Sequence, residues 1–288
     1  SGVNPERSSF HPATREWFAG RFDGPSPAQK KAWPHIMASE STLIAAPTGS
    51  GKTLAAFLCA IDRMVFDGSD ASAAVRRGVR ILYISPVKAL AKDVEKNLQE
   101  PLAGICELAK ERGEAHRVPR VAVRSGDTPQ SERQKMRRDP PDILITTPES
   151  LFLILTSDAR EILRGVDTVI VDEIHAIVGT KRGAHLALSL ERVMRLAGKP
   201  IQRIGLSATS RPLDLVARYL SGSRGRRVEI IDASVKRAFD VRVESAVLDM
   251  TALPRETIET PGPDSGGFKV ERPWMGSGTS ASGRGFVP

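Results

Sequence analysis

Short apolar runs alternate with longer amphipathic segments along most of the chain. The runs are rich in β-branched residues, which is typical of strands buried on both faces of a sheet. Strands are expected at residues 42–46, 79–85, 120–125, 142–146, 167–172, 201–207 and 227–231. Segments between them, such as 52–66, 88–113 and 183–196, have apolar residues at helical spacing. This alternation predicts an α/β fold, a mostly parallel sheet with helices on both faces.

The pattern divides the chain into four parts. Residues 1–40 precede the first strand, and residues 41–235 carry the strand–helix alternation. Residues 236–260 contain one further possible strand, at 239–250. In residues 261–288, 15 of 28 positions are Gly, Pro or Ser, a composition that cannot bury a core and predicts disorder.

Composition narrows the class of protein. No apolar run approaches the roughly 20 residues needed to span a bilayer, and the first residues lack the apolar segment of a signal peptide. Cys59 and Cys106 stand in apolar helical contexts, typical of core thiols in a reducing compartment. We therefore expect a cytoplasmic protein without a membrane partner. The net charge of +8 is equally compatible with a polyanionic partner and with a solvated basic surface.

The segment APTGSGKT (46–53) follows the first predicted strand and opens a helix, which is the context of a P-loop. Gly49 and Gly51 allow the backbone to turn its N–H groups toward phosphate oxygens. Lys52 would reach the β- and γ-phosphates of ATP, and Thr53 would supply a hydroxyl to Mg²⁺. Ala46 stands where the general pattern has its first glycine, and a helix N-terminus without a ligand is the alternative interpretation. The candidate ATP-binding residues of this segment are Thr48, Gly49, Ser50, Gly51, Lys52 and Thr53.

The segment TVIVDEIH (168–175) ends another strand with two adjacent carboxylates. Asp172 can hold Mg²⁺ through water, and Glu173 can orient and deprotonate the attacking water. The catalytic candidates are thus Glu173, Asp172 and Lys52, and the metal candidates are Thr53 and Asp172. An acidic pair after a strand is also typical of a solvated loop start, but a P-loop in the same sheet favours catalysis. His175 alone is more often a structural hydrogen-bonding residue.

The motifs APTGSGKT, PVKALA, TTPESL, DEIH and SAT occur in an order that resembles the first motor domain of a superfamily 2 helicase. The runs at 145–157 and 171–193 more narrowly resemble the bacterial large helicase-related proteins called Lhr. The resemblance spans residues 10–250. It implies a RecA-like P-loop NTPase fold, an ATP-dependent DNA helicase acting in repair, and ATP and Mg²⁺ as cofactors.

The resemblance also assigns roles around the nucleotide. Gln29 in PSPAQKKAW matches the glutamine that reads the adenine edge, and Phe22 either packs nearby or fills the core. Ser207 and Thr209 of SAT match the motif that couples hydrolysis to domain movement by hydrogen-bonding to the DExH segment. His175, within that segment, is grouped with them.

Segments after three other predicted strands resemble those that grip a nucleic-acid backbone. The matching positions are Pro86, Lys88 and Ala89 in SPVKALA, Arg124 and Gly126 in RSGDT, and Thr147 and Glu149 in TTPES. Hydroxyls, N–H groups at helix starts and cations suit phosphate oxygens and ignore base identity. The expected partner is therefore single-stranded nucleic acid, DNA by the Lhr resemblance, held with little sequence preference. Each segment alone is also typical of a turn or helix cap.

Superfamily 2 motors hydrolyse ATP between two similar domains, and the second supplies arginines against the developing charge on the γ-phosphate. Such an arginine contributes about 10³–10⁵ in rate in related GTPases. Nothing after residue 210 resembles that domain, so residues 236–260 are expected to start a linker toward it. We expect the isolated chain to bind ATP and hydrolyse it poorly. An RNA helicase domain and a non-catalytic nucleotide-dependent binding module are the alternatives.

Overall fold

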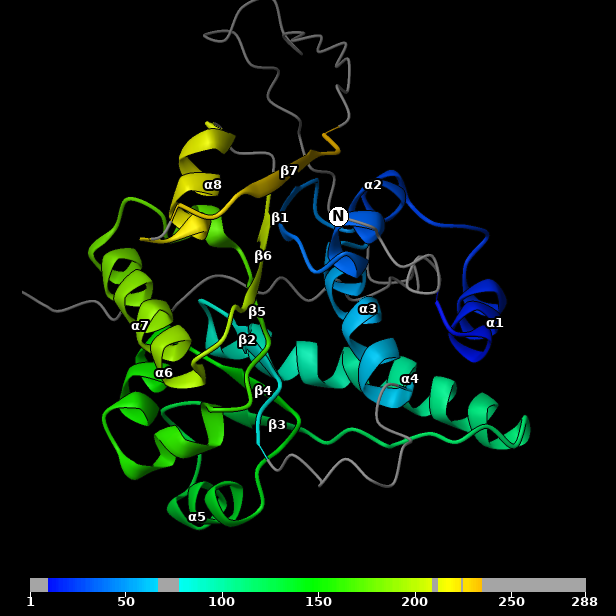
Figure 1. Cartoon of the computed structure of the whole chain (residues 1–288), viewed down its shortest axis with the longest axis horizontal. Coiled ribbons are helices and arrows are strands. Elements are labelled where there is room, and N and C mark those ends of the chain that lie inside the picture. Colours follow the sequence, from blue (N-terminus) through cyan, green and yellow to red (C-terminus); the bar gives the residue numbers. More distant parts are fainter. Residues whose placement is uncertain (1–9, 67–77, 209–211, 224, 235–288) are drawn as a thin grey trace, which may run out of the picture. The chain divides into compact units, whose positions relative to one another are not determined.

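The computed structural model contains a parallel sheet of seven strands in the order β3-β4-β2-β5-β6-β1-β7 (Figure 1). The structure describes residues 10–66, 78–208, 212–223 and 225–234. The strands are β1 (Ser41–Ala45), β2 (Ile81–Ile84), β3 (Val121–Arg124), β4 (Ile143–Thr146), β5 (Thr168–Val171), β6 (Gln202–Ser207) and β7 (Val228–Asp232). Each matches a predicted strand, so the α/β fold is confirmed. The possible strand at 239–250, the linker at 236–260 and the tail at 261–288 lie outside the described residues.

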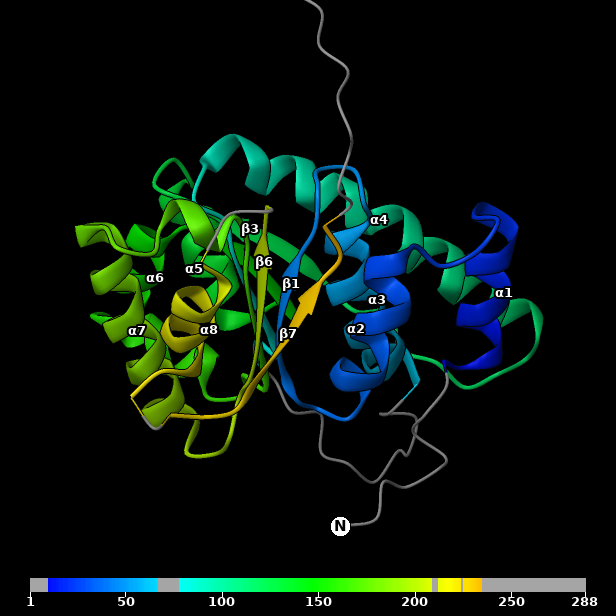
Figure 2. The same ribbon diagram turned by 90° about the horizontal axis from the view of Figure 1, so that it is seen from above.

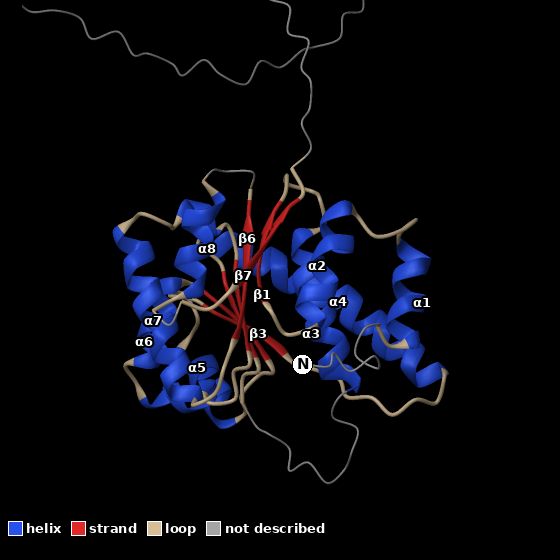
Figure 3. Cartoon of the chain, turned by 45° about the horizontal axis from the view of Figure 1, so that its top comes forward, coloured by secondary structure: helices blue, strands red, loops and turns tan. Residues whose placement is uncertain are grey.

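Helices cover both faces of the sheet (Figures 2 and 3). One side carries α1 (Pro12–Arg21), α2 (Pro27–Met37), α3 (Lys52–Phe66) and α4 (Lys88–Glu111). The other carries α5 (Gln130–Arg138), α6 (Pro148–Leu155), α7 (Lys181–Ala197) and α8 (Leu213–Ser221). Two 3₁₀ turns, η2 (Asp158–Leu163) and η3 (Ile174–Ala176), flank β5.

Alternate residues of each central strand enter two separate cores. On β2, Ile81 and Tyr83 face the α1–α4 side, and Leu82 and Ile84 face the other. This period of two is the geometry of an extended strand. It explains why strands buried on both faces are mainly apolar, without alternation between apolar and polar positions.

The first two helices pack on the same core as the sheet. Trp17, Ala28, Ala32 and Ile36 are buried in the cluster that includes β1 and α3. The segment before β1, which the sequence pattern sets apart from the strand–helix alternation, therefore belongs to the same compact unit as the sheet. Within the described ranges, no helix has the length and apolar character needed to cross a bilayer.

Candidate ATP and nucleic-acid site

The six candidate segments begin at one edge of the sheet, because all the strands are parallel and each segment follows a strand end. The P-loop follows β1, SAT follows β6 and DEIH follows β5, which are three neighbouring strands. SPVKALA follows β2, TTPES follows β4 and RSGDT follows β3, which are the next three. The sheet order thus separates the nucleotide candidates from the nucleic-acid candidates, and DEIH stands at the boundary.

The P-loop adopts the backbone conformation that its glycines permit. Gly49 and Gly51 have φ of +76° and +79°, in the left-handed region that favours glycine. Lys52 is 7 % exposed, and its Nζ donates to the carbonyl oxygens of Ala46 (2.6 Å) and Pro47 (2.9 Å). Burial lowers the pKa of Lys52, and the nearby carboxylates of Glu173 and Asp172 oppose that shift. The lysine of the P-loop and the acidic pair therefore lie close together.

The start of α2 is fastened to the P-loop through a capping box. Ser26 Oγ accepts from Gln29 N (3.3 Å), and Gln29 Oε1 accepts from Ser26 N (2.9 Å). Ser26 Oγ also donates to Ser50 O (2.8 Å), and Gln29 Nε2 donates to Gly51 O (3.4 Å). A Cβ at Gly51 would come within 2.7 Å of Gln29 Nε2, which is the end of a flexible side chain, so the φ of +79° rather than this contact favours glycine there.

The acidic pair is held by backbone and side-chain donors. Asp172 Oδ1 accepts from Glu173 N (2.9 Å), and Asp172 Oδ2 accepts from the hydroxyl of Tyr83 (2.5 Å). Glu173 is half-buried and has a left-handed backbone, with φ of +45°. Burial and the neighbouring Asp172 carboxylate raise the pKa of Tyr83, which keeps its hydroxyl a donor.

His175 connects the acidic pair to SAT. Ala208 N donates to His175 Nδ1 (3.2 Å), and His175 Nε2 lies 3.4 Å from Glu173 Oε2. Because Nδ1 accepts a hydrogen bond, the proton of the neutral imidazole is on Nε2, facing Glu173. Ser207 is buried, and its hydroxyl donates to Ala208 O (2.8 Å). Thr209 lies outside the described residues.

Two ion pairs involve the segments that resemble nucleic-acid-binding motifs. Lys88 Nζ contacts Asp127 Oδ1 (2.9 Å), which joins SPVKALA to RSGDT. Glu149 forms a bidentate pair with Arg182, with contacts of 2.5 and 3.0 Å. Arg182 lies in the first turn of α7, so this pair joins TTPES to the segment that follows DEIH.

The other candidates in these segments differ in exposure. Ala89 and Gly126 are exposed, whereas Pro86, Arg124 and Thr147 are buried. Thr147 is the N-cap of α6, and its side chain accepts from Ser150 N (3.3 Å). Burial lowers the pKa of Arg124, with the nearby Arg133 cation acting in the same direction.

Hard oxygen donors are available for Mg²⁺ where the two nucleotide segments meet. A carboxylate from Asp172 and a hydroxyl from Thr53 suit this ion, which is usually bound by one or two protein oxygens together with substrate phosphates. Within the described ranges, no group of three or more His, Cys, Asp or Glu residues could hold a metal by itself. The residues therefore fit Mg²⁺ carried with a nucleotide.

The sequence analysis did not identify Tyr83, Ser26 or Asp127 as residues of the site. It considered Phe22 as a possible core residue. Phe22 is 43 % exposed, with its ring 4.8 Å from that of Phe18, so the core interpretation is wrong. The motif Ser26-Pro-Ala-Gln29 carried a visible signal, because Ser followed three residues later by Gln is a capping box. The sequence signal for Tyr83 was weaker, because it is only that a buried tyrosine hydroxyl usually has a hydrogen-bond partner.

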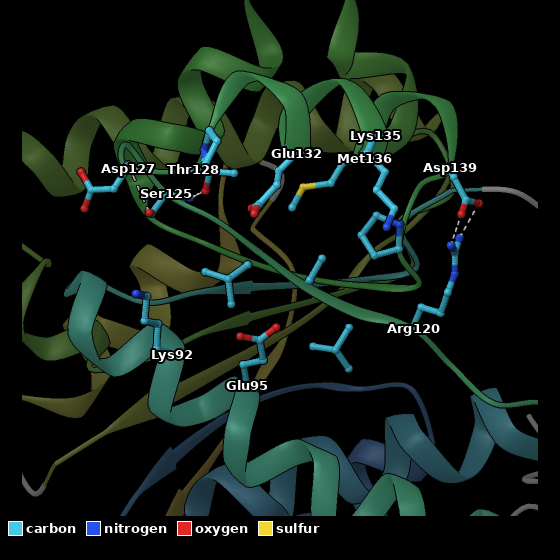
Figure 4. A pocket seen from close by; sticks show the side chains of 15 residues that line it. Lys92, Glu95, Arg120, Ser125, Asp127, Thr128, Glu132, Lys135, Met136 and Asp139 are labelled. Atoms are coloured by element: carbon cyan, nitrogen blue, oxygen red, sulfur yellow. Dashed lines mark hydrogen bonds and ion pairs between the residues drawn. The ribbon is translucent and has the colours of Figure 1, made fainter.

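A cavity of about 670 Å³ opens along β3, between α4 and α5 (Figure 4). Lys92 and Glu95 line it from α4, Glu132 and Lys135 from α5. Ser125, Asp127 and Thr128 of RSGDT border it, but no P-loop or DEIH residue does. This cavity is therefore separate from the nucleotide candidates.

Residues 26–215 match the model of the DEAD/DEAH box helicase family, and the chain belongs to that family. The Lhr resemblance is also confirmed. The chain is 53 % identical over 258 residues to the "Lhr helicase/ probable uracil glycosylase" of Mycolicibacterium smegmatis, and 52 % identical over 254 residues to the "Lhr helicase/uracil glycosylase" of Escherichia coli. These matches cover 90 % and 86 % of the chain but only 17 % and 16 % of the relatives, so it spans about a sixth of their length.

A solved structure supports the same assignment of the fold. Helicase Lhr of Mycobacterium smegmatis, bound to ssDNA and AMP-PNP, matches with a TM-score of 0.74 and 53 % identity. The match covers 86 % of this chain and 31 % of that one. The predicted RecA-like fold of a helicase motor domain is confirmed.

Proposed function

We propose that residues 41–235, with the Gln29 segment before them, form the ATP-binding motor domain of a DNA helicase that moves along single strands. The main support for this proposal is the arrangement of the segments along one edge of the sheet. Three neighbouring strands, β1, β6 and β5, lead to the P-loop, SAT and DEIH. The next three, β2, β4 and β3, lead to segments suited to phosphate backbones. DEIH, on the boundary strand, borders both groups. Hydrolysis and strand binding can therefore influence each other.

In this proposal the triphosphate lies on the backbone N–H groups of the P-loop, at the start of α3, where the helix dipole favours negative charge. Lys52 exchanges its contacts with Ala46 O and Pro47 O for the β- and γ-phosphates. Thr53 and Asp172 would hold Mg²⁺, which would supply charge neutralisation on the phosphates. Glu173 accepts the proton of the attacking water. His175 contacts both Glu173 and Ala208 N, so a change in the charge of Glu173 can alter the hydrogen bond to SAT.

Single-stranded DNA is the favoured partner along β2, β4 and β3. Lys88 and the N-terminus of α6 provide a cation and backbone donors for phosphate oxygens. The relative solved with ssDNA has 53 % identity to this chain, which supports DNA over RNA. An RNA helicase domain is the second candidate, because backbone contacts of this kind accept either sugar.

In the full-length protein a second motor domain would supply arginines to the γ-phosphate. The chain covers about a sixth of its curated relatives, which leaves ample length for such a domain in a protein of their size. The 288-residue chain alone would then bind ATP and Mg²⁺ but turn ATP over slowly.

The test is equilibrium binding of fluorescent AMP-PNP with Mg²⁺ to the wild type and to Lys52→Ala. A charge-assisted hydrogen bond contributes about 1.5–3 kcal/mol, so the variant should bind about 10- to 100-fold more weakly. Lys199→Ala is the matched control, because Lys199 Nζ also donates to a backbone oxygen, that of Gly165 (3.2 Å), outside the P-loop. Equal binding by Lys52→Ala and wild type would refute the P-loop assignment.

The same chain tests the nucleic-acid partner in the presence of AMP-PNP. Single-stranded DNA should displace a labelled DNA strand at lower concentration than RNA of matched sequence. Stronger competition by the RNA would favour the second candidate.

A further inference from the structure

Tyr83 is a buried residue that connects β2 to the acidic pair. It is fully buried, and β2 lies next to β5 in the sheet, with Tyr83 in register with Ile170, two residues before Asp172. Its hydroxyl donates to Asp172 Oδ2 at 2.5 Å. Because the ring is enclosed by the core, solvent cannot readily replace this donor.

The hydroxyl of Tyr83 completes a frame around the Asp172 carboxylate. Oδ1 is held by Glu173 N and Oδ2 by Tyr83, so both oxygens already accept one hydrogen bond. Each carboxylate oxygen has two acceptor directions. The frame leaves one direction on each oxygen and restrains the rotation of the side chain.

The ring of Tyr83 also ties this frame to the helix that follows the P-loop. It stacks on Phe57 of α3, with centroids 5.0 Å apart and an interplanar angle of 26°. Phe57 is four residues after Thr53, so the two share one face of α3. A continuous contact therefore runs from Asp172 through Tyr83 and Phe57 to the helix face that carries Thr53.

We propose that Tyr83 is a positioning residue that sets the Asp172 carboxylate, relative to Thr53, for Mg²⁺ bound with nucleotide. The inference rests on the proposed function and adds a residue that none of the helicase motifs contains. Partners that orient a metal ligand typically change metal affinity by about 10- to 100-fold when removed. Tyr83 acts through Asp172 and does not itself touch the metal or the nucleotide.

The experiment measures the Mg²⁺ concentration for half-maximal binding of fluorescent AMP-PNP to the 288-residue chain. Tyr83→Phe keeps the ring on Phe57 and removes the hydroxyl, and the Mg²⁺ requirement should rise about 10-fold. Affinity for the same nucleotide in excess EDTA should not change, which separates a metal effect from damage to the P-loop. An unchanged Mg²⁺ requirement would overturn the proposal.

A matched control and a double-mutant cycle test how Tyr83 acts. Tyr219→Phe removes the other tyrosine hydroxyl, which donates to Gly183 O (2.7 Å), and should leave the Mg²⁺ requirement at the wild-type value. In an Asp172→Asn background, Tyr83→Phe should have no further effect on Mg²⁺ dependence. A rise of equal size in that background would mean that Tyr83 acts elsewhere, and would refute the proposal.

Phe57→Leu tests the same contact from the side of α3. If Tyr83→Phe does not fold, Phe57→Leu removes the stacking ring and keeps the hydroxyl. It should raise the Mg²⁺ requirement, and a wild-type value would contradict the proposed link to α3. Absence of nucleotide binding by the wild type would refute the proposed function itself, whereas normal binding with no effect of Tyr83→Phe refutes only this inference.

Discussion

Arg182 and Glu149 form the ion pair that links α7, after DEIH, to a segment proposed to bind DNA. The hydrogen bond from Arg182 lowers the pKa of Glu149, with partial burial opposing it. A carboxyl with a lowered folded-state pKa stabilises the fold above its ordinary value of 4.5, and this contribution is lost as pH falls through the folded value. Both side chains are substantially exposed, 40 % and 58 %, so the contribution at neutral pH should be below about 1 kcal/mol.

Urea unfolding of Arg182→Gln, Glu149→Gln and the double variant measures this coupling. The coupling free energy should be favourable at neutral pH and should vanish when Glu149 is protonated, well below pH 4.5. A coupling that is the same in acid and at neutral pH would show that the pair is not held by charge.

Contacts between individual side chains were the feature that could least be predicted from the sequence. Lys52, Asp172 and Glu173 could be placed because their motifs follow recognisable strands. The contacts of Tyr83 with Asp172 and of Lys88 with Asp127 depend on which strands are neighbours, and the sheet order brings residues 89 and 39 positions apart together. A local pattern contains no information on such pairs.

At the scale of elements, α2 supports the P-loop through its N-cap. Ser26 caps the helix and donates to Ser50 O in the loop, so the two elements share one hydroxyl. Ser26→Ala should lower the free energy of unfolding by about 1 kcal/mol and should weaken nucleotide binding severalfold, because the loop loses an anchor.

Thr180→Ala provides the matched control for that prediction. Thr180 caps α7 by accepting from Gly183 N (3.0 Å) and donates to Ile177 O (2.7 Å), and neither partner belongs to the P-loop. It should cost similar stability in thermal unfolding and leave AMP-PNP affinity unchanged. Equal loss of affinity in both variants would mean that the effect of Ser26 is only loss of stability.

Strands were the elements best predicted from sequence. Their β-branched runs place each predicted strand within two residues of the observed one, even the partly buried edge strand β3. Helix α2 was missed because Pro27 and Pro34 obscure its pattern, although Pro27 is at a favourable first-turn position. Packing of Ala28, Ala32 and Ile36 on the core determines that it is a helix.

At the scale of the whole molecule, the proposed function depends on the order of the strands in the sheet. The sequence predicted a parallel sheet and a shared edge, but not the order β3-β4-β2-β5-β6-β1-β7, which depends on long-range pairings. That order brings the P-loop, SAT and DEIH together on one half of the edge. The proposed function requires that the P-loop and DEIH act on one nucleotide.

A crystal structure of this chain with AMP-PNP and Mg²⁺ would reveal whether the two segments do so. We expect the triphosphate on the backbone of residues 49–53, its γ-phosphate facing Lys52 and Glu173, and the metal between Thr53 and Asp172. A nucleotide bound elsewhere, or one whose γ-phosphate and metal face away from Asp172, would contradict it.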